Sequence, residues 1–166
     1  MAITNRTGAV SRYGTAAGTG TLAALVLVAV TGSPAYVGWA QGHTDPNAAG
    51  GWYLRLLAWP AWLVDGSGQA GGVLAADLRA ILLVILTAAL LYLLPATQVA
   101  RVPGPLSQFF SGWAAYVLAG GIAGLLGVLL GPGASMLGAL QTAGAGASYG
   151  FLTGWVIATA SLGGRA

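Results

Sequence analysis

Few side chains in this sequence could perform chemistry, and the first candidates are His43 and Asp45 in the segment GHTDPN. Imidazole and carboxylate groups both ligate metals, but two ligands on a Gly-flanked loop are too few for a metal site. The segment therefore predicts a solvated turn. The chain has no Cys, which excludes disulfides, thiolate catalysis and Cys-ligated zinc or iron–sulfur clusters. We expect neither a metal nor a cofactor.

Asp77 and Arg79 form the second candidate group. Residues two apart on a helix point in different directions, so these two charges need not pair. We interpret them as charges at the boundary of an apolar segment, where a long side chain reaches water easily. A functional pair with Arg55 or Asp65 is the alternative interpretation.

Known catalytic motifs are missing from the rest of the chain. The Gly-rich segment 14–21 lacks the lysine of a phosphate-binding loop and precedes an apolar segment. No Gly-x-Ser-x-Gly or Ser–His–Asp arrangement occurs, and no ionisable residue falls in the middle of an apolar segment, where transport and catalysis usually place one. The polar residues in or near these segments are neutral: Thr87, Gln108, Ser111, Gln141, Thr142, Ser148, Tyr149 and Thr153. The sequence therefore predicts a protein that is not an enzyme.

The composition predicts an integral membrane protein. Of the 166 residues, 57% are hydrophobic and 5% are charged, whereas soluble domains carry roughly a quarter charged residues. Six scattered Arg form no basic stripe, so we expect the lipid bilayer as a partner and no nucleic acid. Basic residues that are all Arg and acidic residues that are all Asp suggest a GC-rich bacterial genome, and hence the bacterial inner membrane.

Four segments are long enough to cross a bilayer, which needs about 20 apolar residues. They cover about 16–39, 77–95, 109–131 and 136–160. The expected fold is thus an all-α membrane domain over 1–166, a bundle of four transmembrane helices.

The first segment also resembles a secretory signal peptide, with Ser33 and Ala35 at the cleavage positions. Its full spanning length, with Tyr36 and Trp39 at the outer interface, favours an uncleaved span.

The Arg residues set the expected orientation, because positive loops stay in the cytoplasm. With both termini inside, four Arg are cytoplasmic and two are outside. The cytoplasmic ones are Arg6, Arg12, Arg101 and Arg165, and the outer side holds Arg55 and Arg79 together with Asp45, Asp65 and Asp77.

An additional short helix is expected over about 51–64, in the sequence GWYLRLLAWPAWLV. Its 14 residues would extend about 21 Å, too short for a span. The clustered aromatic residues predict a helix lying at the headgroups of the outer leaflet, kinked at Pro60, with Arg55 directed to water or lipid phosphate. The alternative is a re-entrant or protein-packed cap, and the two differ in whether Trp59 contacts lipid or protein. The expected interfacial residues are Trp52, Arg55, Trp59 and Trp62.

Small residues recur every fourth position in the last expected span. The ladder comprises Ala134, Gly138, Thr142, Gly146, Gly150, Gly154 and Ala158, and the preceding span carries Gly120, Gly124, Gly127 and Gly131. Such strips let helix backbones approach closely in lipid, where no hydrophobic force drives association. Chance is the alternative in a chain with 28 Gly. The expected helix-packing residues are Gly120, Gly124, Gly138, Gly146, Gly150 and Gly154.

Two functions are compatible with these features. The first is a non-catalytic scaffold or subunit that packs through Gly/Ala-rich helix faces against protein partners, or against itself, in a larger membrane complex. The kind of complex, whether secretion, conjugation or respiratory, is not decidable from the residues. The second is an oligomeric channel or small-solute transporter lined by neutral polar groups. A transporter requires a continuous polar path, whereas a scaffold shows dry Gly/Ala contacts.

Overall fold

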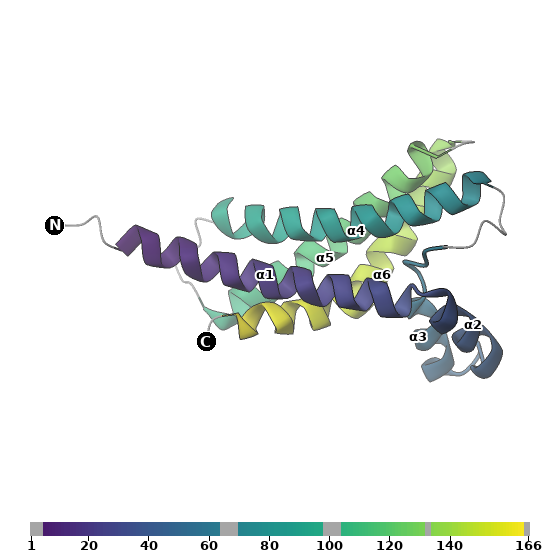
Figure 1. The fold of residues 1–166 in the computed structure, drawn as a ribbon, viewed down its shortest axis with the longest axis horizontal. Coiled ribbons are helices and arrows are strands. Elements are labelled where there is room, and N and C mark those ends of the chain that lie inside the picture. Colours follow the sequence, from purple (N-terminus) through teal and green to yellow (C-terminus); the bar gives the residue numbers. More distant parts are fainter. Residues whose placement is uncertain (1–4, 64–69, 98–103, 132–133, 165–166) are drawn as a thin grey trace.

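The computed structural model describes residues 5–63, 70–97, 104–131 and 134–164, which form six α-helices and no strand. The helices are α1 (Asn5–Thr31), α2 (Pro34–His43), α3 (Ala49–Leu57), α4 (Ala70–Thr97), α5 (Pro105–Leu129) and α6 (Met136–Gly163). The expectation of an all-helical chain is therefore confirmed. In Figure 1, the first turn of α1 and the last turn of α6 lie at one end of the molecule, while α2 and α3 lie at the other.

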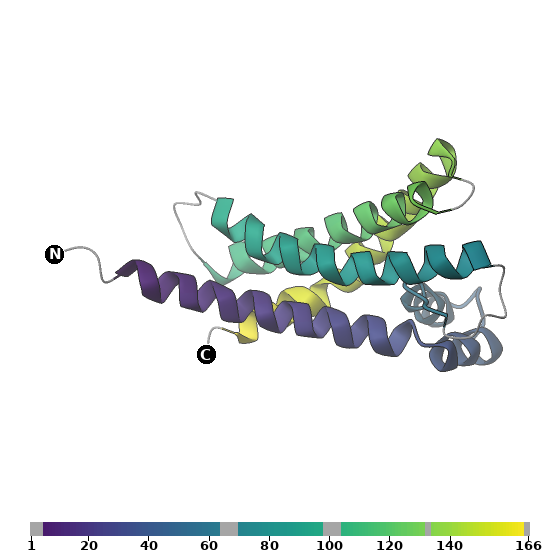
Figure 2. The same ribbon diagram turned by 45° about the horizontal axis from the view of Figure 1, so that its top comes forward.

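The four long helices alternate in direction and form a closed ring of contacts. Helix α1 contacts α4 and α6, and α5 contacts α4 and α6. Helices α1 and α4 lie side by side, and α5 and α6 cross them obliquely (Figures 1 and 2). The contact between α5 and α6 is the most extensive of these. At the end opposite the first turn of α1, the α5–α6 corner and the α2–α3 lobe diverge (Figure 1).

Two of the described helices are long and apolar enough to cross a membrane, namely Gly72–Leu94 within α4 and Pro105–Leu129. A third candidate is the bent pair of α1 and α2. Helix α6 covers the fourth expected span but is not among the candidates, because its many Gly, Ser and Thr residues lower its mean hydropathy. The structure thus supports a membrane protein with two or three candidate spans, and a bundle of four spans stays a prediction.

The first expected span, 16–39, is not one straight helix. Helix α1 ends at Thr31, and α2 begins at Pro34 at an angle of 59°. The side chain of Ser33 caps α2 by accepting a hydrogen bond from the Tyr36 N–H at 3.2 Å. Pro34 lacks an N–H and disfavours helical backbone at the residue before it, so it starts α2 and separates it from α1.

The helix expected over 51–64 is shorter and differently placed. Helix α3 spans Ala49–Leu57, and the chain after it turns and becomes irregular up to Leu63, while position 64 lies outside the described residues. Pro60 explains the early end, because a proline removes a helix hydrogen bond and its ring clashes with the carbonyl four residues earlier. The turn brings the residues after α3 against α1, where the Trp62 N–H donates to the Gly32 carbonyl at 3.0 Å.

Small side chains fill the interior, and many large apolar side chains lie outside. Ala115, Ala119 and Ala123 of α5 are fully buried, with Leu83 of α4 and Ile157 of α6 beside them. Many large aliphatic and aromatic side chains are at least half exposed, including Leu22, Leu25, Ile81, Ile85, Leu137, Leu140, Phe151 and Trp155. A water-soluble monomer rarely exposes so much contiguous apolar surface, whereas lipid contact accounts for it.

Candidate functional site

The α5–α6 contact is made by backbone against backbone. A Cβ added to Gly120 would overlap the carbonyl oxygen of Gly146, and a Cβ on Gly124 would overlap that of Thr142. A Cβ on Gly150 would lie 2.7 Å from the Tyr116 carbonyl oxygen. No side chain fits in these places, so glycine is required for the helices to approach this closely.

The six expected helix-packing glycines differ in how tightly the opposite helix packs on them. Besides Gly120, Gly124, Gly146 and Gly150, the close contact includes Gly154, whose Cβ would lie 2.6 Å from Trp113 Cδ1. Gly138 lies at the edge of the contact, in the first turn of α6: its N–H donates to the capping Ser135 side chain at 3.1 Å, and its Cβ position is 3.8 Å from Val128 Cγ1 of α5. Because α5 covers the strip within the same chain, the strip itself is not a surface for another protein.

Polar side chains fasten the two helices at three levels. The Tyr116 and Tyr149 hydroxyls lie 3.1 Å apart, and both residues are fully buried. Trp113 Nε1–H donates to the Phe151 carbonyl at 2.8 Å, and Gln108 Nε2–H donates to the Ser161 carbonyl at 2.9 Å. These bonds satisfy polar groups that the bilayer could not hydrate.

Trp59 connects the segment after α3 to the bundle. Its ring stacks on Tyr149 with 5.2 Å between ring centroids, and the Arg79 guanidinium carbon lies 4.8 Å from the Trp59 ring centroid. Within the described residues, Arg79 Nε is buried without a hydrogen-bond partner, so the aromatic face is the main stabilising contact seen for this cation. Trp59 therefore contacts protein, as the alternative interpretation of a packed cap requires.

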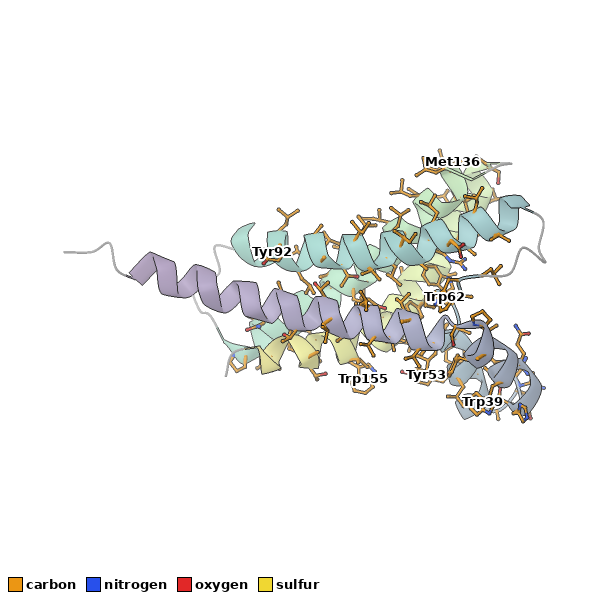
Figure 3. The ribbon with its side chains drawn as sticks, in the orientation of Figure 1. Trp39, Tyr53, Trp62, Tyr92, Met136 and Trp155 are labelled. Atoms are coloured by element: carbon orange, nitrogen blue, oxygen red, sulfur yellow. The ribbon has the colours of Figure 1, made fainter. Side chains whose placement is uncertain are left out.

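The other expected interfacial residues differ in their exposure and in what they contact. Trp52 is 51% exposed, whereas the Trp62 indole N–H donates to the Val28 carbonyl at 3.2 Å. The Arg55 side chain is held within the lobe, where its Nη2–H group donates to the Gln41 and Thr44 carbonyls at 2.8 and 2.6 Å. A cation on the last carbonyls of α2 also complements the helix dipole. In Figure 3, Trp62 lies close to α1 and α4, away from the outer side of the lobe that carries Trp39.

The residues first considered for chemistry have structural partners. His43 Nδ1 lies 3.2 Å from the Trp39 carbonyl, and the Asp45 carboxylate accepts from the Asn47 N–H at 2.9 Å, as in the expected turn. Asp77 Oδ1 accepts from the Leu63 N–H at 2.8 Å. Over the ranges that the structure describes, no three His, Asp or Glu residues gather as they would around a metal. Asp65 lies outside the described residues.

Three contacts of the bundle were not expected from the sequence. The contact between Arg79 and Trp59 joins residues from separate elements, and no sequence signal pairs them. Gly112 lies against α6, with its Cβ position 3.2 Å from the Ala158 Cα, and Gly20 of α1 faces Leu91 of α4. An extension of the four-residue spacing from Gly120 back through Tyr116 leads to Gly112 and could have found it.

No family model, no curated protein and no solved structure matches this chain.

Proposed function

We propose that this protein is a non-catalytic, multi-pass subunit of a larger complex in the bacterial inner membrane. In this proposal α1, α4, α5 and α6 provide the four spans, α2 continues from the outer end of α1, and both termini are cytoplasmic. The α2–α3 lobe then lies at the outer surface, at the opposite end from the first turn of α1 (Figure 1). The Arg distribution supports this orientation, because positively charged segments stay inside.

The observation that carries the proposal is one exposed face of α6. Gln141, Gly144 and Ser148 lie three and four residues apart, which places them on one side of the helix, and all three are exposed. Outside the backbone of α6, no described atom lies within 4 Å of the position of a Gly144 Cβ. Amide and hydroxyl groups facing lipid gain about 0.6 kcal/mol each when a neighbouring helix bonds them.

The α5–α6 contact supports a subunit rather than a transporter. Along this contact glycine backbones touch and the polar side chains bond across it, as the Tyr116 and Tyr149 hydroxyls do, so the close packing leaves no open polar path between α5 and α6. Transport through a single chain needs polar groups that face a continuous path. The small and polar face of α6, which points away from α5, is the part of the helix suited to a partner helix.

Affinity purification of the tagged chain from its native membranes, followed by mass spectrometry, tests the proposal. We expect a membrane protein to co-purify with the wild type and to be lost from Gly144→Leu, because Leu would hold the partner helix away. Gly18→Leu is the matched control, since Gly18 is exposed on α1 with no described atom near its Cβ position. Co-purification that survives in Gly144→Leu, or a wild type that purifies alone, would contradict the proposal.

A further inference from the structure

We propose that a groove between α1 and α4 holds one acyl chain of an outer-leaflet phospholipid, and that Asp77 binds the ammonium group of its headgroup. Phosphatidylethanolamine is the phospholipid that this chemistry selects. The inference rests on the membrane placement in the proposed function, but not on any protein partner.

The groove has a volume of about 650 Å³ and an apolar lining. Its walls include Leu25, Val28 and Ala29 from α1, and Ile81 and Ile85 from α4. Leu25, Ile81 and Ile85 are each more than half exposed, so the groove opens sideways, toward the lipid. A lipid chain can therefore enter from the bilayer without any movement of the helices.

The polar end of the groove is formed by the segment after α3. Trp62, Leu63 and Asp77 line it together, and the Trp62 indole is held by its bond to the Val28 carbonyl. Figure 3 shows Trp62 near the end of the bundle that carries the α2–α3 lobe, which is the outer end in the proposed orientation. The groove thus has the polarity of a phospholipid: one polar end at the surface and apolar walls below it.

The length of the groove fits one leaflet. From Asp77 to Ile85 the helix rises about 12 Å at 1.5 Å per residue. One leaflet contributes about 15 Å of hydrocarbon. With Asp77 at the level of the headgroups, Ile85 lies near the bilayer midplane, which is the depth that one acyl chain reaches.

The volume argues against a partner helix as the occupant. A helix about 10 Å wide with a rise of 1.5 Å occupies roughly 120 Å³ per residue. The groove would accommodate only about five such residues, far fewer than the 20 of a span. A single flexible chain fills it, which is why we assign it to a lipid tail.

The headgroup is selected by Asp77. Its Oδ1 accepts the Leu63 N–H, and among the described residues it has no ion-pair partner, because the nearby Arg79 guanidinium lies over Trp59. A carboxylate at the membrane surface attracts a cation, and an ammonium also donates hydrogen bonds to it. A headgroup that ends in a hydroxyl, as in phosphatidylglycerol, has no such cation.

Native mass spectrometry of the delipidated protein, given equal amounts of phosphatidylethanolamine and phosphatidylglycerol with identical chains, tests the assignment. We expect the wild type to retain one lipid and to prefer phosphatidylethanolamine about fivefold, as for a partly exposed ion pair. Asp77→Asn keeps an oxygen for the Leu63 N–H but removes the charge, so it should retain one lipid without preference. Ala29→Phe should fill the groove and lose the lipid, whereas Ala114→Phe, at an exposed position of α5, should retain it.

Three results would overturn the proposal: equal retention of both lipids by the wild type, a preference that persists in Asp77→Asn, or a lipid that stays bound in Ala29→Phe. None of them affects co-purification of a partner, which depends on Gly144. If the chain were released from membranes without detergent, both this inference and the proposed function would fail together.

Discussion

Gly120 of α5 and Gly146 of α6 each place a carbonyl oxygen where the Cβ of the other residue would lie. The contact is reciprocal, so neither residue can accept a side chain without moving the opposite backbone. Backbone atoms in a helix cannot swing aside as the end of a long side chain can. The distance between α5 and α6 is therefore set by these two glycines.

Replacement of Gly120 by Ala should lower the free energy of unfolding by about 1–3 kcal/mol, the usual penalty of overpacking. Gly144→Ala should leave it unchanged or raise it slightly, because the Cβ meets open space and Ala favours helix more than Gly does. Unfolding in mixed micelles, followed by circular dichroism, measures both. An equal loss of unfolding free energy in the two variants would show that α5 and α6 are less closely packed at Gly120 than described.

Larger substitutions separate folding from assembly. Gly150→Leu should still insert into the membrane, since Leu is favourable in lipid, but the isolated protein should melt at a lower temperature because Leu forces α5 and α6 apart. Gly144→Leu should melt like the wild type and lose only its partner. The melting temperature of each purified variant measures folding, and its amount in the membrane fraction measures insertion. If the two variants melted at the same temperature, the four-residue spacing of the glycines would reflect only the high glycine content of the chain.

The contact of Arg79 with Trp59 should contribute to stability as a coupled pair. In a double-mutant cycle with Arg79→Met and Trp59→Leu, we expect a coupling free energy of about 0.5–2 kcal/mol. Trp52→Leu is the control, because Trp52 is half exposed and should show no coupling to Arg79. Additive losses in the Arg79 and Trp59 variants would show that the cation is stabilised by other groups.

The buried tyrosine pair should also behave as a unit. Tyr149→Phe leaves the buried Tyr116 hydroxyl without this partner, at a cost of about 1–3 kcal/mol. Tyr116→Phe should cost less, because the side chains of Thr31 and Thr153 also interact with the Tyr149 hydroxyl. The double variant should lose less than the sum of the two, because no Tyr116 hydroxyl is then left unpaired. Denaturant titration of the three variants measures the difference, and a double variant that loses the full sum would contradict the coupling of the two hydroxyls.

The orientation can be tested with single cysteines, since the chain has none of its own. Cys at Asn47 or Ala134 should react with an impermeant thiol reagent added to intact cells. Cys at Leu106, which is 73% exposed at the start of α5, should react only after the cells are opened. Labelling of position 106 from outside would invert the proposed topology.

The elements of this fold follow from local sequence more directly than their contacts do. The spacing of Gly146, Gly150 and Gly154 places them on one face of a helix, so their use against a neighbouring helix could be predicted. The break between α1 and α2 was harder to predict from the sequence, because the segment TGSPA fits a signal-peptide cleavage site as well as a helix start. In the structure Ser33 caps α2, and the uncleaved span stays a prediction that N-terminal sequencing of the mature protein would test.

The surroundings of Trp59 could not be predicted from sequence. Amphipathic spacing predicts that aromatic residues share a face, but not what covers that face. Here Pro60 ends the helical path early, and the chain that follows returns to α1 and α4, which brings Trp59 onto Tyr149 and Arg79. The same return creates the polar end of the groove, so neither feature is visible in a helical projection of the segment.

The fourfold spacing of the ladder has a consequence for how α6 finds its register on α5. A slide by one turn would bring Gly150 opposite Gly120, and glycine would again meet glycine, so the small residues alone permit more than one alignment. The Tyr116–Tyr149 bond and the contact between the Trp113 and Phe151 rings exist in one alignment only. The glycines thus determine how close the helices come, and the aromatic side chains determine which turn faces which.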